Sequence, residues 1–229
     1  MQSTNEQSQP CERCEERPAT ARYTRKNLSM MLCAPCLDRM TVQEAYENRL
    51  RHIGDLEIRG QYDEALACLD EILEANCDRD HERWLARSIA RDRAIILRDA
   101  GRYAEAEQAC KAWSDLGITD VGERWMYGDV TTSTLDALGR PREGLAVLED
   151  ALSYRDPKDV PGAWAYLRDL AKLSEKLGQP VDSKFRSLAV ETAAANGVEM
   201  PQHESLGKAI LEIAETIGGK EEPDDDDND

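Results

Sequence analysis

Positive charge, aromatic residues and long apolar runs are all scarce in this chain of 229 residues. Lys and Arg number 29 against 46 Asp and Glu, and the formal net charge is -17. Such a balance disfavours a general nucleic-acid binder, because a phosphate backbone needs clustered cations. No segment approaches the roughly 18 consecutive apolar residues of a membrane span, so we expect a soluble protein that does not enter a bilayer.

Aromatic side chains and histidine are also few, with one Phe, 5% aromatic residues and three His. A core must therefore be built mainly from Leu, Ile and Ala, which favours helix packing over a sheet sandwich. The sequence has no phosphate-binding loop, nucleophile elbow, dinucleotide fingerprint or His-Glu-x-x-His pattern. We therefore expect a protein that is not an enzyme, with its many carboxylates on a solvated surface.

The first ten residues lack the cationic start and the apolar stretch of a secretory signal. We expect residues 1–10 to be a disordered amino terminus and the protein to be cytoplasmic. In a reducing compartment, the seven Cys are better examined for metal binding than for disulfides.

Four of these cysteines form two Cys-x2-Cys pairs with eighteen residues between the pairs: Cys11, Cys14, Cys33 and Cys36. Four thiolates satisfy tetrahedral zinc, and two such pairs close the site. The intervening segments 19–24 and 28–32 read as short strands joined at Lys26 and Asn27, a hairpin too small to be stable without metal. The pattern predicts a module over residues 11–40 with one structural Zn²⁺. A redox dithiol is the alternative, but it expects a single motif on a βαβ scaffold.

A glycine-centred repeat follows over residues 41–200. Gly60, Gly101, Gly139 and Gly178 recur at intervals of 41, 38 and 39 residues. Apolar residues have helical spacing on both sides of each Gly, which predicts that one helix ends there and another begins. We therefore expect an all-α fold, an α-solenoid of about four helical hairpins. The spacing of Leu206, Ile210, Ile213 and Ile217 predicts a capping helix over residues 201–219, and the acidic residues 220–229 predict a disordered tail.

The pattern Gly-x-Tyr-x-x-Ala at residues 60–65 and 101–106 resembles the tetratricopeptide repeat. In the third and fourth units Pro141 and Pro180 replace the Tyr, and Pro is tolerated in the first turn of a helix. The resemblance implies that the first helix of each hairpin lines a concave, partner-binding surface. On that mapping the partner-binding residues are Arg91, Ile95, Arg98, Met126, Asp129, Arg168 and Lys172. For Arg91 and Arg98, ion pairs with neighbouring acidic residues are the alternative to binding a partner's carboxylate.

The amino-terminal cysteine segment carries a second resemblance. The run Cys-Glu-Arg-Cys-Glu-Glu-Arg-Pro-Ala-Thr at residues 11–20, followed by Leu-Cys-Ala-Pro-Cys at 32–36, resembles the zinc modules of bacterial McsA-type proteins. That family implies regulation of a protein partner in quality control, as an adaptor of a kinase or a protease.

Our leading hypothesis is a scaffold or adaptor that docks a protein or peptide partner. The alternative is a nucleic-acid-linked regulator whose zinc module contacts DNA or RNA. Residues 1–40 carry six basic against five acidic residues. A small basic-aromatic cluster lies among them: Arg22, Tyr23, Arg25 and Lys26. The sequence leaves the partner, the pathway and the oligomeric state open.

Overall fold

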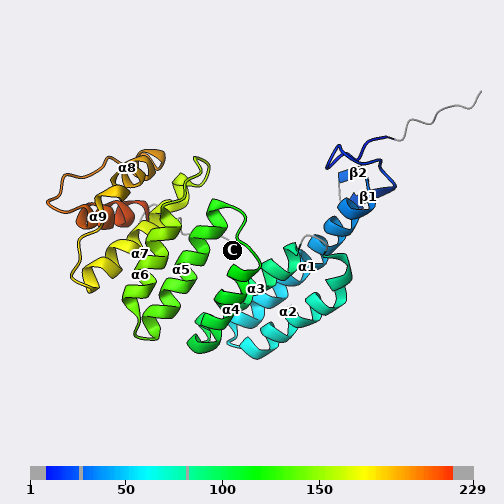
Figure 1. Cartoon of the computed structure of the whole chain (residues 1–229), viewed down its shortest axis with the longest axis horizontal. Coiled ribbons are helices and arrows are strands. Elements are labelled where there is room, and N and C mark those ends of the chain that lie inside the picture. Colours follow the sequence, from blue (N-terminus) through cyan, green and yellow to red (C-terminus); the bar gives the residue numbers. More distant parts are fainter. Residues whose placement is uncertain (1–8, 26–27, 81–82, 219–229) are drawn as a thin grey trace, which may run out of the picture. The chain divides into compact units, whose positions relative to one another are not determined.

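The computed structural model of the chain describes residues 9–25, 28–80 and 83–218 (Figure 1). Two expectations fall outside these described residues: the turn at Lys26 and Asn27, and disorder of the acidic tail 220–229. Of the expected disordered residues 1–10, the structure describes only 9 and 10, where Pro10 forms a β-bridge with Pro18. The chain divides into two compact units, Met1–Ile96 and Leu97–Asp229.

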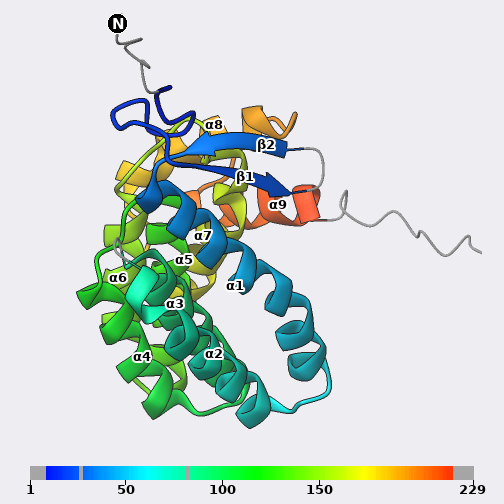
Figure 2. The same cartoon turned by 90° about the vertical axis from the view of Figure 1, so that its right-hand side faces the viewer.

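The first unit begins with a β-hairpin. Strand β1 (Ala21–Arg25) pairs antiparallel with β2 (Leu28–Leu32), with Ala21 opposite Leu32, which confirms the two strands expected from the sequence. Strand β2 leads directly into helix α1 (Ala34–Ile58), whose first turn contains Pro35. Figure 2 shows the hairpin beside the amino-terminal end of α1.

Helix α1 continues without a break through residue 40, so the cysteine module and the first repeat share this helix. It forms a hairpin with α2 (Tyr62–Asn76), which is followed by a 3-10 turn at Cys77–Arg79 and by α3 (Trp84–Asp99). The expected apolar stripe of α2 is buried, with Ala65 and Leu69 fully inaccessible to solvent. Helical spacing in the sequence therefore placed the core face of this helix correctly.

The second unit consists of helices and short 3-10 turns in the described residues. Helices α5, α6 and α7 lie side by side, and α8 and α9 contact α7 (Figure 1). The elements are α4 (Tyr103–Asp115), α5 (Val121–Ala137), α6 (Pro141–Leu152), α7 (Ala163–Lys176), α8 (Arg186–Ala195) and α9 (Leu206–Gly218), with 3-10 turns at Val160–Gly162 and Ser183–Phe185.

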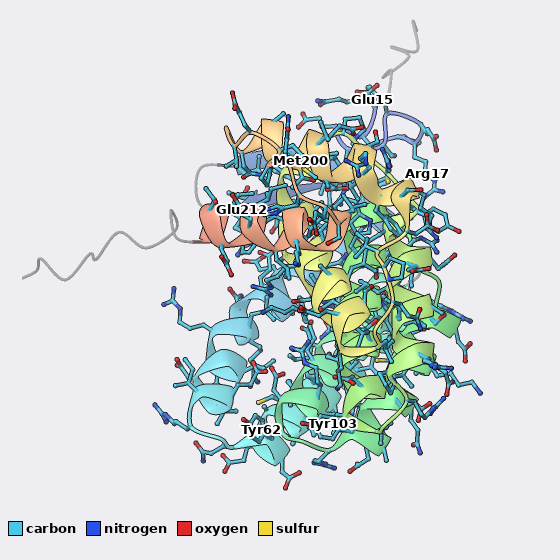
Figure 3. All side chains as sticks on the ribbon, turned by 90° about the vertical axis from the view of Figure 1, so that its left-hand side faces the viewer. Glu15, Arg17, Tyr62, Tyr103, Met200 and Glu212 are labelled. Atoms are coloured by element: carbon cyan, nitrogen blue, oxygen red, sulfur yellow. The ribbon has the colours of Figure 1, made fainter. Side chains whose placement is uncertain are left out.

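The four repeat glycines all have left-handed backbone conformations. Their φ values are 71°, 70°, 76° and 64° for Gly60, Gly101, Gly139 and Gly178. Residues with a Cβ adopt this conformation only at a cost, and a glycine in it ends a helix. Two residues after the first three of these glycines a new helix begins, at Tyr62, Tyr103 and Pro141. Figure 3 labels Tyr62 and Tyr103. The predicted boundaries of the first three hairpins are confirmed.

The fourth hairpin departs from the expected register. Pro180 does not start a helix; α8 begins at Arg186, after the 3-10 turn. Two contacts explain the delay. The side chain of Val181 is buried in the core, and the carboxylate of Asp182 accepts a hydrogen bond from the Lys184 amide at 2.9 Å, so that the helical backbone starts after this cap.

Helix α9 has the apolar face that its sequence predicts. Leu206, Ile210, Ile213 and Ile217 are all buried, and the helix packs against α7 and α8. Among the helices of the described residues, none combines the length and the apolar character needed to cross a membrane.

Candidate functional site

The four predicted zinc ligands come together at the start of the first unit. The sulfur atoms of Cys11, Cys14, Cys33 and Cys36 all lie within 4.8 Å of one another, so among the described residues these four form a group that could hold a metal ion. Cys14 Sγ and Cys33 Sγ are 3.8 Å apart. Zinc–sulfur bonds of about 2.3 Å in a tetrahedron place neighbouring sulfurs about 3.8 Å apart, so this spacing fits zinc.

Backbone hydrogen bonds shape the turn that carries the first cysteine pair. The Cys11 amide donates to the Arg17 carbonyl at 2.8 Å, and the Glu15 amide donates to the Cys11 carbonyl at 2.9 Å. Glu15 has a positive φ of 57°, which tightens this turn. The Glu12 amide reaches across to the Met31 carbonyl of β2 at 2.9 Å. The first cysteine pair is thereby tied to the hairpin.

The second cysteine pair lies at the junction between β2 and α1. Cys33 is the N-cap residue of α1, and Cys36 is in the first turn of that helix. Cys11, Cys33 and Leu32 are buried, and Leu37 and Met40 of α1 pack against them. The cluster is therefore shielded by the hairpin on one side and by α1 on the other.

The environment of the cluster moves two of its thiol pKa values in opposite directions. Burial alone would raise the pKa of Cys11, but hydrogen bonds from the backbone of Cys33, Cys14 and Arg13 outweigh burial and lower it to about 6. Burial and hydrogen bonds with the other three sulfurs raise the pKa of Cys36 to about 12. A dication bound to the four sulfurs would favour the thiolate form of each, so metal binding should release protons.

The basic-aromatic cluster of the hairpin is partly occupied by α1. Tyr23 is 6% exposed, and its hydroxyl donates to Glu44 at 3.0 Å. Arg25 forms ion pairs with Glu47 at 2.8 Å and with Glu44 at 3.4 Å. Of the described members of this cluster, Arg22 is the one that remains exposed. Nucleic-acid binding by the module stays a prediction, and these contacts do not favour it.

In the first unit, the predicted partner-binding residues Arg91 and Ile95 lie half-buried on α3. The Arg91 guanidinium contacts Asp92 at 2.8 Å and donates to the Tyr46 hydroxyl at 2.9 Å. Tyr46 also donates to Asp92, and its ring meets the ring of Trp84 edge-to-face at 5.5 Å. The ion-pairing alternative weighed for Arg91 is thus present in the structure, on a side chain that solvent still reaches.

In the second unit, helices α5 and α7 bound a groove of about 320 Å³. Two predicted partner-binding residues, Asp129 and Lys172, line it. The other lining residues come from the same two helices: Thr132, Ser133, Asp136, Asp169, Leu173 and Lys176. The first helices of the hairpins were expected to line one surface. In the third and fourth hairpins these helices are α5 and α7, and together they line this groove.

Asp129 and Asp169 bring two carboxylates together across this groove. Burial raises the pKa of Asp129 to about 6, with a further contribution from the charge and hydrogen bond of Asp169. Arg98 offsets only part of this effect, because its guanidinium lies 3.5 Å from Asp129 but 2.8 Å from Asp99. Arg168 contacts Asp169 at 2.9 Å. The groove therefore holds a carboxylate pair that is incompletely neutralised.

The surroundings of three other predicted partner-binding residues are as follows: Met126, Lys172 and Arg168. Met126 is half-buried on α5. Lys172 is exposed and has no ion pair among the described residues. Arg168 also lies over the ring of Trp164, at 5.5 Å from its centroid.

The mapping of the partner surface missed Asp169, Lys176, Tyr46 and Asp92. Helical spacing could have suggested the first two, since Asp169, Lys172 or Leu173, and Lys176 follow one another at intervals of three or four on α7. The cluster around Tyr46 had no such signal, because it joins helices that are far apart in sequence.

Comparison with known proteins gives one family match. Residues 58–120 match the tetratricopeptide repeat family, a segment that contains the first two Gly-x-Tyr-x-x-Ala patterns and makes up about a quarter of the chain. No curated protein and no solved structure matches the chain. Tetratricopeptide-type helical hairpins are therefore supported by sequence and fold together. The McsA-type resemblance of the cysteine module stays a prediction.

Proposed function

We propose that this protein is a non-catalytic scaffold or adaptor that docks a protein partner on the first-helix surface of its repeats. The observation that carries the proposal is the groove between α5 and α7, whose lining includes Asp129 and Lys172, two of the residues predicted to bind a partner. The tetratricopeptide match over residues 58–120 supports it, because such repeats generally mediate protein–protein interaction.

The occupant that suits this groove is a peptide segment of the partner that carries a basic side chain. Such a side chain would neutralise Asp129 and Asp169, whose negative charges repel each other in the free protein. An acidic group on the same segment would find Lys172 at the groove's edge. Paired charges of this kind give specificity and orientation to an interface.

The four-cysteine module has a structural role in this proposal. Cys11, Cys14, Cys33 and Cys36 would hold one Zn²⁺ with four protein ligands, which leaves no coordination position for a substrate. The ion would supply the cross-link that a hairpin with five-residue strands lacks. We also propose a cytoplasmic location, because zinc-binding thiols must remain reduced.

The docking proposal is tested by site-specific photocrosslinking of the full chain. A photoreactive residue at Ser133, which lines the groove, should give a covalent adduct with a partner from lysate, and one at Lys111, exposed on α4, should not. The purified partner should then bind Asp169→Asn about tenfold more weakly than the unmodified chain. Asp150→Asn is the matched control, because Asp150 is exposed on α6. Adducts formed only at position 111, or equal losses in both variants, would contradict groove docking.

A further inference from the structure

The amino-terminal end of α1 has Pro35 in its first turn but lacks two other features that ordinarily stabilise the start of a helix. Its N-cap residue, Cys33, makes no side-chain capping hydrogen bond, and no acidic residue lies in the first turn. Both are common sources of stability at this end of a helix. What holds the first turn is the cysteine cluster: Cys33 and Cys36 belong to it, and Leu37 packs against it. The start of α1 therefore depends on the state of the cluster.

The hairpin gives α1 two further attachments beyond its first turns. The Tyr23 hydroxyl donates to Glu44 at 3.0 Å, and Arg25 is 2.8 Å from Glu47. These bonds exist only while the hairpin keeps its register, and a two-stranded hairpin of this length is marginal without another constraint. A metal at the four cysteines supplies that constraint, so its loss should release the attachments to α1 together with the cluster.

The next buried positions of α1 reach the predicted partner surface of the first unit. Val42 is 1% and Tyr46 is 3% exposed. Tyr46 accepts a hydrogen bond from Arg91 at 2.9 Å and donates to Asp92. Its ring contacts Trp84 at the start of α3. One helix thus carries cysteine ligands at its first turn and the support of Arg91 three turns later.

We propose that metal binding at the four cysteines fixes α1 from Ala34 to Tyr46 and thereby positions Arg91 on α3. The module is then a metal-dependent support for the first repeat. The importance of Arg91 for docking rests on the proposed function. The coupling between the cluster and α3 does not, because it follows from contacts within the first unit.

Hydrogen exchange followed by mass spectrometry, on the full chain with one Zn²⁺ and after chelation, tests this coupling without a partner. After chelation, peptides covering residues 34–46 and 84–95 should both exchange at least about tenfold faster, while α6 keeps its protection. Cys14→Ser should reproduce this pattern without a chelator. Cys68→Ser is the matched control, because Cys68 lies on α2 outside the cluster and its loss should leave both peptides protected.

A third variant isolates the connection through the tyrosine hydroxyl. Tyr46→Phe should bind zinc with unchanged stoichiometry and keep residues 34–46 protected when loaded. In this variant chelation should accelerate exchange of residues 84–95 by a smaller factor than in the unmodified chain. Faster exchange of residues 34–46 alone would overturn the coupling, as would no change in either peptide or an equal loss of protection in α6. If the exchange experiment contradicts the coupling, the proposal of groove docking in the second unit still stands. If the crosslinking experiment contradicts groove docking, the coupling within the first unit still stands.

Discussion

Gly128 on α5 lies against Ala151 on α6 so closely that a Cβ added to Gly128 would be 2.6 Å from the Ala151 Cβ. Nearby, a Cβ on Gly144 would be 3.0 Å from the Thr132 carbonyl. The two helices of this hairpin can approach only because glycine occupies both positions. Gly128→Ala should therefore lower the free energy of unfolding by about 1–3 kcal/mol, since the clash exceeds the gain in helix propensity. Urea denaturation measures it.

A matched control for this substitution exists on α1. Gly54 lies in the interior of that helix, and a Cβ there would meet nothing within 4 Å. Gly54→Ala should raise the free energy of unfolding by roughly 0.5–1 kcal/mol, because it removes backbone freedom without a clash. Destabilisation by both substitutions would show that close approach of α5 and α6 is not the cause.

The Asp129 carboxyl predicts a pH-dependent change in stability. Its pKa is raised to about 6 in the folded protein, so the folded state holds this proton more tightly than the unfolded state. Ionisation of Asp129 therefore lowers the free energy of unfolding as the pH rises from about 4 to about 6. Asp129→Asn should stabilise the protein by on the order of 1–2 kcal/mol at about pH 7.5, and the gain should vanish by about pH 4.

Asp136→Asn is the control for that measurement. Asp136 lines the same groove, but it has Lys176 within 2.5 Å, and this exposed pair contributes about 0–1 kcal/mol. The asparagine variant should not be more stable than the unmodified chain. Urea titrations at several pH values compare the two, and equal behaviour would contradict the special environment of Asp129.

Zinc stoichiometry tests the four-cysteine cluster directly. Native mass spectrometry should find one Zn²⁺ per chain, and Cys33→Ser should lose it because tetrahedral coordination needs all four thiolates. Cys77→Ser is the control, since Cys77 is exposed beyond α2 and outside the cluster. A folded hairpin that carries no metal in the unmodified chain would refute the assignment.

The capping role of α9 is tested by replacing Ile with Ala at one buried and one exposed position. Ile210 is 2% exposed, and Ile58 at the end of α1 is 87% exposed. Ile210→Ala should cost about 2–5 kcal/mol in unfolding free energy, because it leaves a cavity between α9 and the core. Ile58→Ala should stay within about 0.5 kcal/mol of the unmodified chain. Thermal and urea unfolding measure both, and similar losses would contradict the packing of α9.

Much of the fold could be predicted because its determinants are local. The repeat glycines needed only the left-handed conformation that glycine adopts easily, and apolar spacing identified the buried faces of α2 and α9. Pro180 shows the limit of this reasoning. Its position after Gly178 suggested a helix start, but the burial of Val181 and the cap at Asp182 delay the helix to Arg186.

The candidate sites also contain some residues that the sequence could predict and others that it could not. The sequence could predict that Cys11, Cys14, Cys33 and Cys36 cluster, because a zinc site calls for thiols at a short, repeated spacing. Asp169 and Tyr46 were missed because their significance comes from neighbours on other helices, Asp129 and Arg91 respectively. Helical spacing assigns a residue to a face, but it does not say which charge on a neighbouring helix will oppose it.

By itself, the sequence determined the all-helical character of the repeats, the boundaries of the first three hairpins, the apolar face of α9 and the four cysteines that cluster in the structure. Each follows from backbone conformation, periodicity or ligand chemistry within a short stretch of chain. Only the tertiary structure decided the pairing of Asp129 with Asp169, the groove between α5 and α7, and the contact of Tyr46 with Arg91. These depend on how separate helices pack, because burial and neighbouring charge are properties of the packed chain and not of any one segment.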